Sequence, residues 1–131
     1  MIGIDTNVLL RLFTIDSPEQ TAATNKLIGK RGPNSIRLTN IVVAELVWTL
    51  VRRYRREKRE IVNIVEQLLE REELVFESRN AVMMALRWFE GGKADFADYL
   101  IGALNDEAGA SPTYTFDHMA AGHVAFSLVE P

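Results

Sequence analysis

The sequence has 131 residues, of which 47% are hydrophobic, and we expect residues 1–131 to form one globular domain. Its 15 lysine and arginine residues are outnumbered by 18 aspartate and glutamate residues. The formal charge of −3 excludes a protein that binds polyanions over its whole surface, so any nucleic-acid contact must be local. The chain has no cysteine, which excludes a disulfide scaffold, a thiolate zinc site and a cysteine nucleophile.

The hydrophobic segments are short and interrupted by charges. The amino-terminal apolar stretch contains Asp5, and no run reaches the roughly 18 uncharged residues that a membrane span needs. We therefore expect a cytoplasmic protein that does not contact a membrane.

Apolar runs and turn residues predict short strands that alternate with helices. The expected strands are residues 1–4, 36–39, 74–77, 113–116 and 125–129. The expected helices begin with one near residue 6 and continue with 18–28, 41–51, 61–69, 81–89 and 95–108. Ser17 before Pro18, and Thr39 or Asn40 before Ile41, are good helix caps. This alternation predicts an α/β fold, a three-layer α/β/α sandwich with a central parallel sheet.

Four acidic residues are expected near the carboxyl ends of the strands. Asp5 and Asp117 directly follow predicted strands. Glu45 lies about one turn into the helix after the second strand, and Asp98 lies in the first turns of a later helix. Because the functional crevice of an open parallel sheet lies beyond the carboxyl ends of its strands, these four residues can meet there.

Each of these aspartates also has a structural alternative. Asp5 and Asp117 could simply cap the helices that they precede, because a carboxylate accepts free backbone N–H groups there. Asp95 and Asp98 are spaced as a cap and its third-position partner, and we assign the capping role to Asp95. Asp98 then points toward the crevice.

Glu45 lies among Val42, Val43, Leu46 and Val47 on a helix that is apolar on nearly every side, so we expect it to be buried. An unpaired buried charge is costly, and no basic residue lies within a turn of it. A metal ion or a partner cation is the natural compensation.

Clustered carboxylates repel one another, which raises some of their pKa values until a divalent cation binds. Oxygen ligands without cysteine select hard ions, and a site with few carboxylates suits Mg²⁺ or Mn²⁺. Such an ion can orient a water molecule, lower its pKa and stabilise charge on a phosphate. We therefore expect hydrolysis of phosphodiester bonds.

Four sequence elements together resemble the PIN-domain ribonucleases, specifically the VapC-type toxins of bacterial toxin–antitoxin pairs. The elements are Ile-Asp-Thr-Asn at 4–7, Ala-Glu at 44–45, Asp-Phe-Ala-Asp-Tyr-Leu-Ile at 95–101 and Thr-Phe-Asp at 115–117. The resemblance covers the entire chain. It implies that the acidic residues of these elements are catalytic and ligate one or two metal ions: Asp5, Glu45, Asp98 and Asp117. Asn7 and Thr115 would support them by hydrogen bonds.

The resemblance also implies endonucleolytic cleavage of RNA, a homodimer, and a cognate antitoxin that packs across the apolar surface near the active site. Complexes of such pairs bind operator DNA through the antitoxin. The chain departs from the family pattern at Tyr99, where a small residue often follows the helix aspartate. Asp95 offers a competing carboxylate in the same turn, so the third ligand stays open between Asp95 and Asp98.

Two rival functions make different demands on the sequence. Phosphoryl transfer to aspartate, as in haloacid-dehalogenase-like phosphatases, requires a second aspartate where this chain has Asn7, and receiver domains require paired acids after the first strand and a late lysine. Neither pattern is present. A catalytically inactive PIN-like module that dimerises or binds a partner is the other rival, and the retention of all four acids argues against it.

Two further features have structural alternatives. Residues 52–59 include six basic residues in eight, which could hold RNA or keep a helix end soluble, and we favour the second. Trp48 and Trp88 could stack on bases, but we expect them in the core, where aromatic residues among apolar neighbours usually lie. His118 is expected at the rim of the site, with no role as a base.

Overall fold

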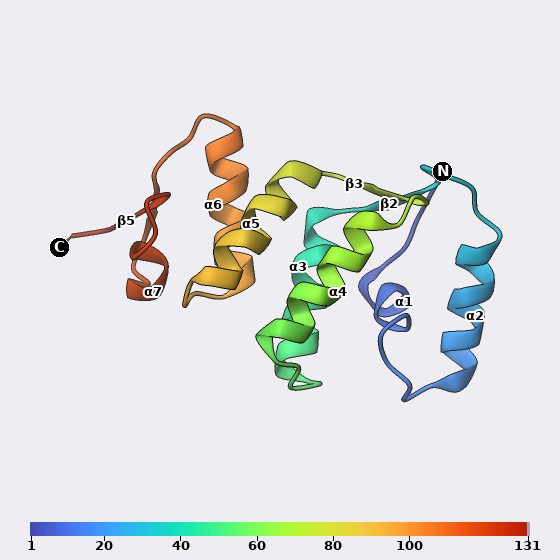
Figure 1. The fold of residues 1–131 in the computed structure, drawn as a ribbon. Coiled ribbons are helices and arrows are strands. Elements are labelled where there is room, and N and C mark those ends of the chain that lie inside the picture. Colours follow the sequence, from blue (N-terminus) through green and yellow to red (C-terminus); the bar gives the residue numbers. More distant parts are fainter. Residues whose placement is uncertain (131) are drawn as a thin grey trace. The chain divides into compact units, whose positions relative to one another are not determined.

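The computed structural model describes residues 1–130, in two compact units (Figure 1). Unit 1 is Met1–Glu77, and unit 2 begins at Ser78. Each unit has its own parallel sheet and its own helices.

Unit 1 contains a parallel sheet in the order β1-β2-β3. Its strands are β1 (Ile2–Gly3), β2 (Ile36–Leu38) and β3 (Leu74–Phe76). Ile36 on the central strand pairs with Ile2 on one side and Leu74 on the other. Ile36 and Leu38 are buried while Arg37 between them is exposed, as the alternation of side chains along a strand requires.

The helices of unit 1 connect these strands and begin at recognisable caps. They are α1 (Thr6–Leu10), α2 (Pro18–Gly29), α3 (Asn40–Arg52) and α4 (Lys58–Glu70). The Ser17 side chain accepts the N–H of Gln20 at the start of α2, and Thr39 accepts the N–H of Val42 at the start of α3. The capping predictions at Ser17 and Thr39 are therefore confirmed.

The exposed side of α3 corrects two predictions. The buried residues of this helix form one face: Val42, Val43, Leu46, Val47 and Leu50. Ile41, Glu45 and Trp48 lie on the opposite face, one and two helical turns apart, and all three are exposed. The predictions that Glu45 is buried and that Trp48 belongs to the core are therefore wrong. Because the helix is apolar almost all round, its sequence did not reveal which face would be covered.

Unit 2 packs helices against a pair of parallel strands. Its elements are α5 (Arg79–Gly91), α6 (Phe96–Glu107), β4 (Thr113–Thr115), α7 (His118–Ala121) and β5 (Phe126–Leu128). Thr113 pairs with Phe126 across the strands. The Phe126 ring packs directly on α6 at Gly102, where an added Cβ atom would come within 2.4 Å of the ring. Gly102 thus permits the close approach of helix and strand.

The predicted strands and helices are confirmed, with small differences at their ends. The parallel pairing of every neighbouring pair of strands among residues 1–130 confirms the α/β class with a parallel sheet. Helix α7 was foreseen only through the capping alternative at Asp117, because four residues are too few to display a helical period. No helix in the described part of the chain is both long enough and apolar enough to span a bilayer.

Candidate active site

Asp5 is held at the start of α1, two residues after β1. Its Oδ1 atom accepts a hydrogen bond from the N–H of Val8 at 3.0 Å, so the carboxylate caps the helix. The residue is exposed, and a carboxylate retains lone pairs beyond the one that this cap uses. A cavity of about 250 Å³, also lined by Asn7 and Thr24, lies beside it. Capping and ligand binding are therefore compatible at Asp5.

Glu45 is tied to the residue that follows Asp5. The Thr6 hydroxyl donates a hydrogen bond to Oε1 of Glu45 at 2.8 Å. This bond joins α1, after the first strand, to α3, after the second strand. Unit 1 therefore brings Asp5 and Glu45 to the same region. Thr6 was not among the predicted site residues, although it lies within the Asp-Thr-Asn element.

Asn7 contacts a buried arginine. Its Oδ1 atom accepts a hydrogen bond from Nη2 of Arg11 at 2.9 Å. The Arg11 side chain is only 8% exposed and also pairs with Asp16. Arg11 thus links α1 to the loop that follows it, and the predicted support of the acidic residues by Asn7 stays a prediction.

Asp98 and Asp117 form a second acidic pair, in unit 2. Asp98 lies in the first turn of α6 and is half-buried, whereas Asp117 caps α7 by accepting the N–H of Met119 at 2.8 Å. Burial raises the pKa of Asp98, and the negative charges of Asp117 and Asp95 raise it further. A hydrogen bond between the carboxyl groups of Asp98 and Asp117 acts in the same direction, because such a bond requires a proton.

The neighbours of this pair clarify two other predicted residues. Asp95 occupies the predicted cap position of α6, where its carbonyl oxygen accepts the N–H of Asp98 at 3.1 Å. Its side chain makes no capping hydrogen bond, so the prediction that the Asp95 carboxylate caps the helix is wrong. The Thr115 hydroxyl accepts the backbone N–H of Asp117 at 2.9 Å and so fixes the turn that presents this carboxylate.

The four predicted acids are thus brought together as two pairs, Asp5 with Glu45 and Asp98 with Asp117. Within residues 1–130, no group of three or more histidine, aspartate or glutamate side chains is arranged to hold a metal ion. The convergence of both pairs on one ion stays a prediction. The donor atoms fit a hard divalent cation, because all are carboxylate oxygens, and such a cation would relieve the repulsion that raises the pKa of Asp98.

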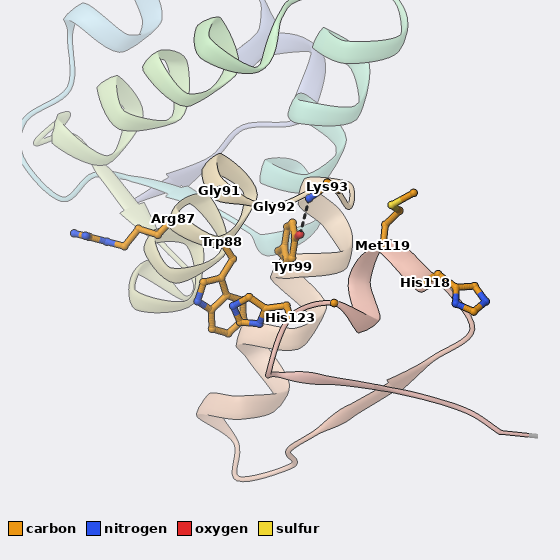
Figure 2. A pocket seen from close by; sticks show the side chains of 10 residues that line it. Arg87, Trp88, Gly91, Gly92, Lys93, Tyr99, His118, Met119 and His123 are labelled. Atoms are coloured by element: carbon orange, nitrogen blue, oxygen red, sulfur yellow. Dashed lines mark hydrogen bonds between the residues drawn. The ribbon is translucent and has the colours of Figure 1, made fainter.

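Tyr99 has a structural role in the turn before α6, the helix that carries Asp98. The side chain is buried, and its hydroxyl oxygen accepts the backbone N–H groups of Lys93 at 3.1 Å and Ala94 at 3.2 Å (Figure 2). Gly92 makes room for the hydroxyl, since an added Cβ atom would lie 1.9 Å from it. The large residue that departs from the family pattern therefore anchors the turn that leads to Asp95.

Short parallel strands that lead into acidic residues define the chain as an α/β protein with an acidic candidate site. The profile of the PIN domain matches residues 2–125. The chain therefore belongs to the PIN-domain family, which confirms the predicted membership, and this family consists of nucleases.

Among solved structures, the chain is similar to VapC20 from Mycobacterium tuberculosis, whose crystal structure is described as that of a Sarcin-Ricin loop cleaving toxin. The two chains are 17% identical, and the match covers 93% of this chain and 94% of that chain with a TM-score of 0.45. The sequence matches no curated protein.

Proposed function

We propose that this chain is a metal-dependent endoribonuclease of the VapC type, the toxic member of a type II toxin–antitoxin pair. In this proposal residues 1–131 form one domain, and the acidic residues that follow its parallel strands act together. The two acidic pairs would then hold Mg²⁺ or Mn²⁺ together. Membership of the PIN-domain family supports the nuclease activity.

The observation that carries the proposal is the pair of carboxyl groups at Asp98 and Asp117. Burial raises the pKa of Asp98, and the negative charge of Asp117 raises it further, so the ionised form of Asp98 is unfavourable without a compensating cation. Like charges held together in this way concentrate at functional sites, where a cation or a reacting group compensates them. A second acidic pair at Asp5 and Glu45, also near the end of a parallel strand, would supply further donors to such a cation.

The described hydrogen bonds hold the expected ligands in place. The ligands would be the four acids Asp5, Glu45, Asp98 and Asp117. The Val8 N–H fixes Asp5, the Thr6 hydroxyl fixes Glu45, and the Met119 N–H fixes Asp117. When bound, a divalent ion supplies activation of water and charge stabilisation at the phosphate. Preoriented ligands reduce the rearrangement that binding requires, and no side-chain nucleophile is needed.

The proposed partners follow from the proposed class. The substrate is RNA, the chain forms a homodimer in the cytoplasm, and a cognate antitoxin protein covers an apolar surface and carries the complex to operator DNA. The exposed apolar side chains of Ile41 and Trp48 lie on one face of α3 and support such a surface, because exposed apolar side chains gathered on one face mark interaction sites.

Cleavage of RNA by the purified protein tests this function. We expect internal cleavage in Mg²⁺ or Mn²⁺, none in EDTA, and a loss of more than about a hundredfold in Asp98→Asn, because outer ligands alone are worth 10- to 100-fold in metal sites. Glu66→Gln, an exposed change in α4, is the matched control and keeps full activity. Undiminished cleavage by Asp98→Asn would refute the site, and a wild type that binds metal without cleaving RNA would favour an inactive binding module.

A further inference from the structure

Unit 2 contains a cavity that the proposed chemistry does not use. It has a volume of about 580 Å³, within the range of small-molecule sites, and lies among α5, the turn after it, α6 and α7 (Figure 2). The cavity is lined by the side chains of Arg87, Trp88, Lys93, Tyr99, Met119 and His123, among others.

The wall of this cavity is aromatic. The rings of Trp88 and His123 lie side by side with their centroids 4.4 Å apart and their planes inclined by 41°. The Tyr99 ring stands edge-on to His123, with centroids 6.0 Å apart. Trp88 is half-buried, so the expectation that it belongs wholly to the core is wrong. The accessible parts of the half-buried Trp88 and His123 rings offer aromatic surface of the kind that stacks on nucleic-acid bases.

The polar groups of the cavity are hydrogen-bond donors. Nδ1 of His123 accepts the N–H of Ala125 at 3.1 Å, so the neutral ring carries its proton on Nε2. The Tyr99 oxygen already accepts two backbone N–H groups, which leaves its own hydrogen to be donated. The indole N–H of Trp88 can only donate, and Arg87 and Lys93 add positive charge at the rim. Among the described residues no carboxylate lines the cavity.

This combination selects a particular chemistry. A ligand that satisfies it is planar, negatively charged and rich in hydrogen-bond acceptors, and a nucleotide meets all three conditions. The cavity also adjoins the acidic pair along the chain, because Tyr99 follows Asp98 and His118, another lining residue, follows Asp117. Each of these two carboxylates therefore belongs to a residue next to one that lines the cavity.

We propose that this cavity binds one nucleotide of the RNA substrate, with its base stacked on Trp88 and its phosphate paired with Lys93. The inference rests on the proposed ribonuclease function and adds the means by which the enzyme positions its substrate. Arg87, whose side chain extends away from the aromatic wall in Figure 2, would contact the continuing strand.

Fluorescence of Trp88 tests the cavity without any metal or cleavage. The chain has two tryptophans, so Trp48→Phe leaves Trp88 as the single reporter. In EDTA, adenosine 5′-monophosphate is expected to change this fluorescence and to saturate, and a short RNA is expected to displace it. Lys93→Met should weaken both ligands about tenfold, which is typical for loss of one hydrogen bond to a charged group. Lys30→Met, an exposed change at the end of α2, should bind both as the parent does.

The outcomes separate this inference from the proposed function. Absence of binding at millimolar nucleotide, or equal binding by Lys93→Met and Lys30→Met, overturns the cavity assignment even if the wild type cleaves RNA. Binding of the mononucleotide without displacement by RNA also overturns it, because the cavity would then serve a free nucleotide. Binding and displacement as expected, in a protein that cleaves no RNA with Mg²⁺ or Mn²⁺, would support the cavity and overturn the ribonuclease.

Discussion

The Thr6 hydroxyl donates a hydrogen bond to Glu45, which stands on a different helix of unit 1. The donor follows Asp5 directly, so this bond ties Glu45 to the residue next to Asp5. Because Glu45 is exposed, packing alone does not hold its carboxylate, and the hydroxyl restricts where it points. Thr6 is thus a positioning residue in the proposed site.

Replacement of Thr6 tests this role. Thr6→Val keeps the shape of the side chain but removes the donor, so we expect cleavage of RNA to fall by about 10- to 100-fold, the usual cost of losing an outer-shell hydrogen bond at a metal site. Thr6→Ser keeps the hydroxyl and should retain activity near that of the wild type. Both variants should unfold within about 1 kcal/mol of the wild type. Equal activity of the two variants would contradict the positioning role.

Removal of the Asp98 charge should stabilise the metal-free protein. The pKa of Asp98 is raised by burial and by the charges of Asp117 and Asp95, so the ionised form is less favourable in the folded chain than in the unfolded chain. In EDTA near neutral pH, Asp98→Asn should raise the free energy of unfolding by up to about 1 kcal/mol, a limit set by solvent screening of a half-exposed group.

The pH dependence of this gain follows from the sign of the shift. The destabilisation of the wild type is present above the raised pKa of Asp98 and vanishes as the pH falls below the unfolded pKa. Urea unfolding at several pH values should therefore show the advantage of Asp98→Asn shrinking as the pH falls. An advantage that is constant with pH, or a loss of stability at neutral pH, would show that the carboxyl pair carries no such cost.

Local signals explain which parts of the fold could be predicted. The caps at Ser17 and Thr39 act on the first turn of their own helices, so the residues that decide these boundaries are neighbours in sequence. The strands were predictable for the same reason, since most are short runs of apolar, β-branched or aromatic residues bounded by turns. At Asp95 the same logic placed the cap correctly but wrongly predicted a capping hydrogen bond from its side chain.

Features that depend on distant residues could not be predicted in this way. The bond from Thr6 to Glu45 joins positions 39 residues apart, and no local pattern encodes it. The exposure of Trp48 depends on which face of α3 the rest of unit 1 covers. Because apolar residues surround this helix almost uniformly, their pattern does not indicate the buried face. The turn anchored by Tyr99 likewise requires Gly92 to be brought against a ring on the next helix.

Metal binding tests whether the two acidic pairs meet. Mg²⁺ or Mn²⁺ should raise the melting temperature of the wild type, by a stabilisation of about 1.4 kcal/mol at ten times the Kd. If one site contains both pairs, Asp5→Asn in unit 1 and Asp98→Asn in unit 2 should each abolish the shift, while Glu66→Gln keeps it. A shift that survives Asp5→Asn but not Asp98→Asn would assign the ion to unit 2 alone.

The glycine pair at the carboxyl end of α5 offers a matched test of the Tyr99 anchor. A Cβ atom at Gly92 would lie 1.9 Å from the Tyr99 hydroxyl, whereas one at Gly91 meets nothing within 4 Å. Gly92→Ala should therefore lower the free energy of unfolding by about 1 to 3 kcal/mol, as overpacking does. Gly91→Ala, at the end of the helix, should be neutral or slightly stabilising. Similar midpoints of urea unfolding for the two variants would show that the turn yields to the extra atom.

Asp16 should make folding stability depend on pH in the opposite direction to Asp98. The Tyr54 hydroxyl donates a hydrogen bond to its carboxylate at 2.8 Å, and this bond, with the nearby Arg11 charge, lowers the pKa of Asp16. A lowered pKa in the folded state gives stability that is present above the unfolded value of about 3.9 and is lost as the pH falls through the folded pKa.

The difference in unfolding free energy between the wild type and Asp16→Asn should thus be clear near about pH 6 and shrink toward about pH 2.5. Tyr54→Phe removes the principal cause and should reduce the pH dependence of that difference, so an unchanged profile in Tyr54→Phe would show that the hydroxyl does not set it.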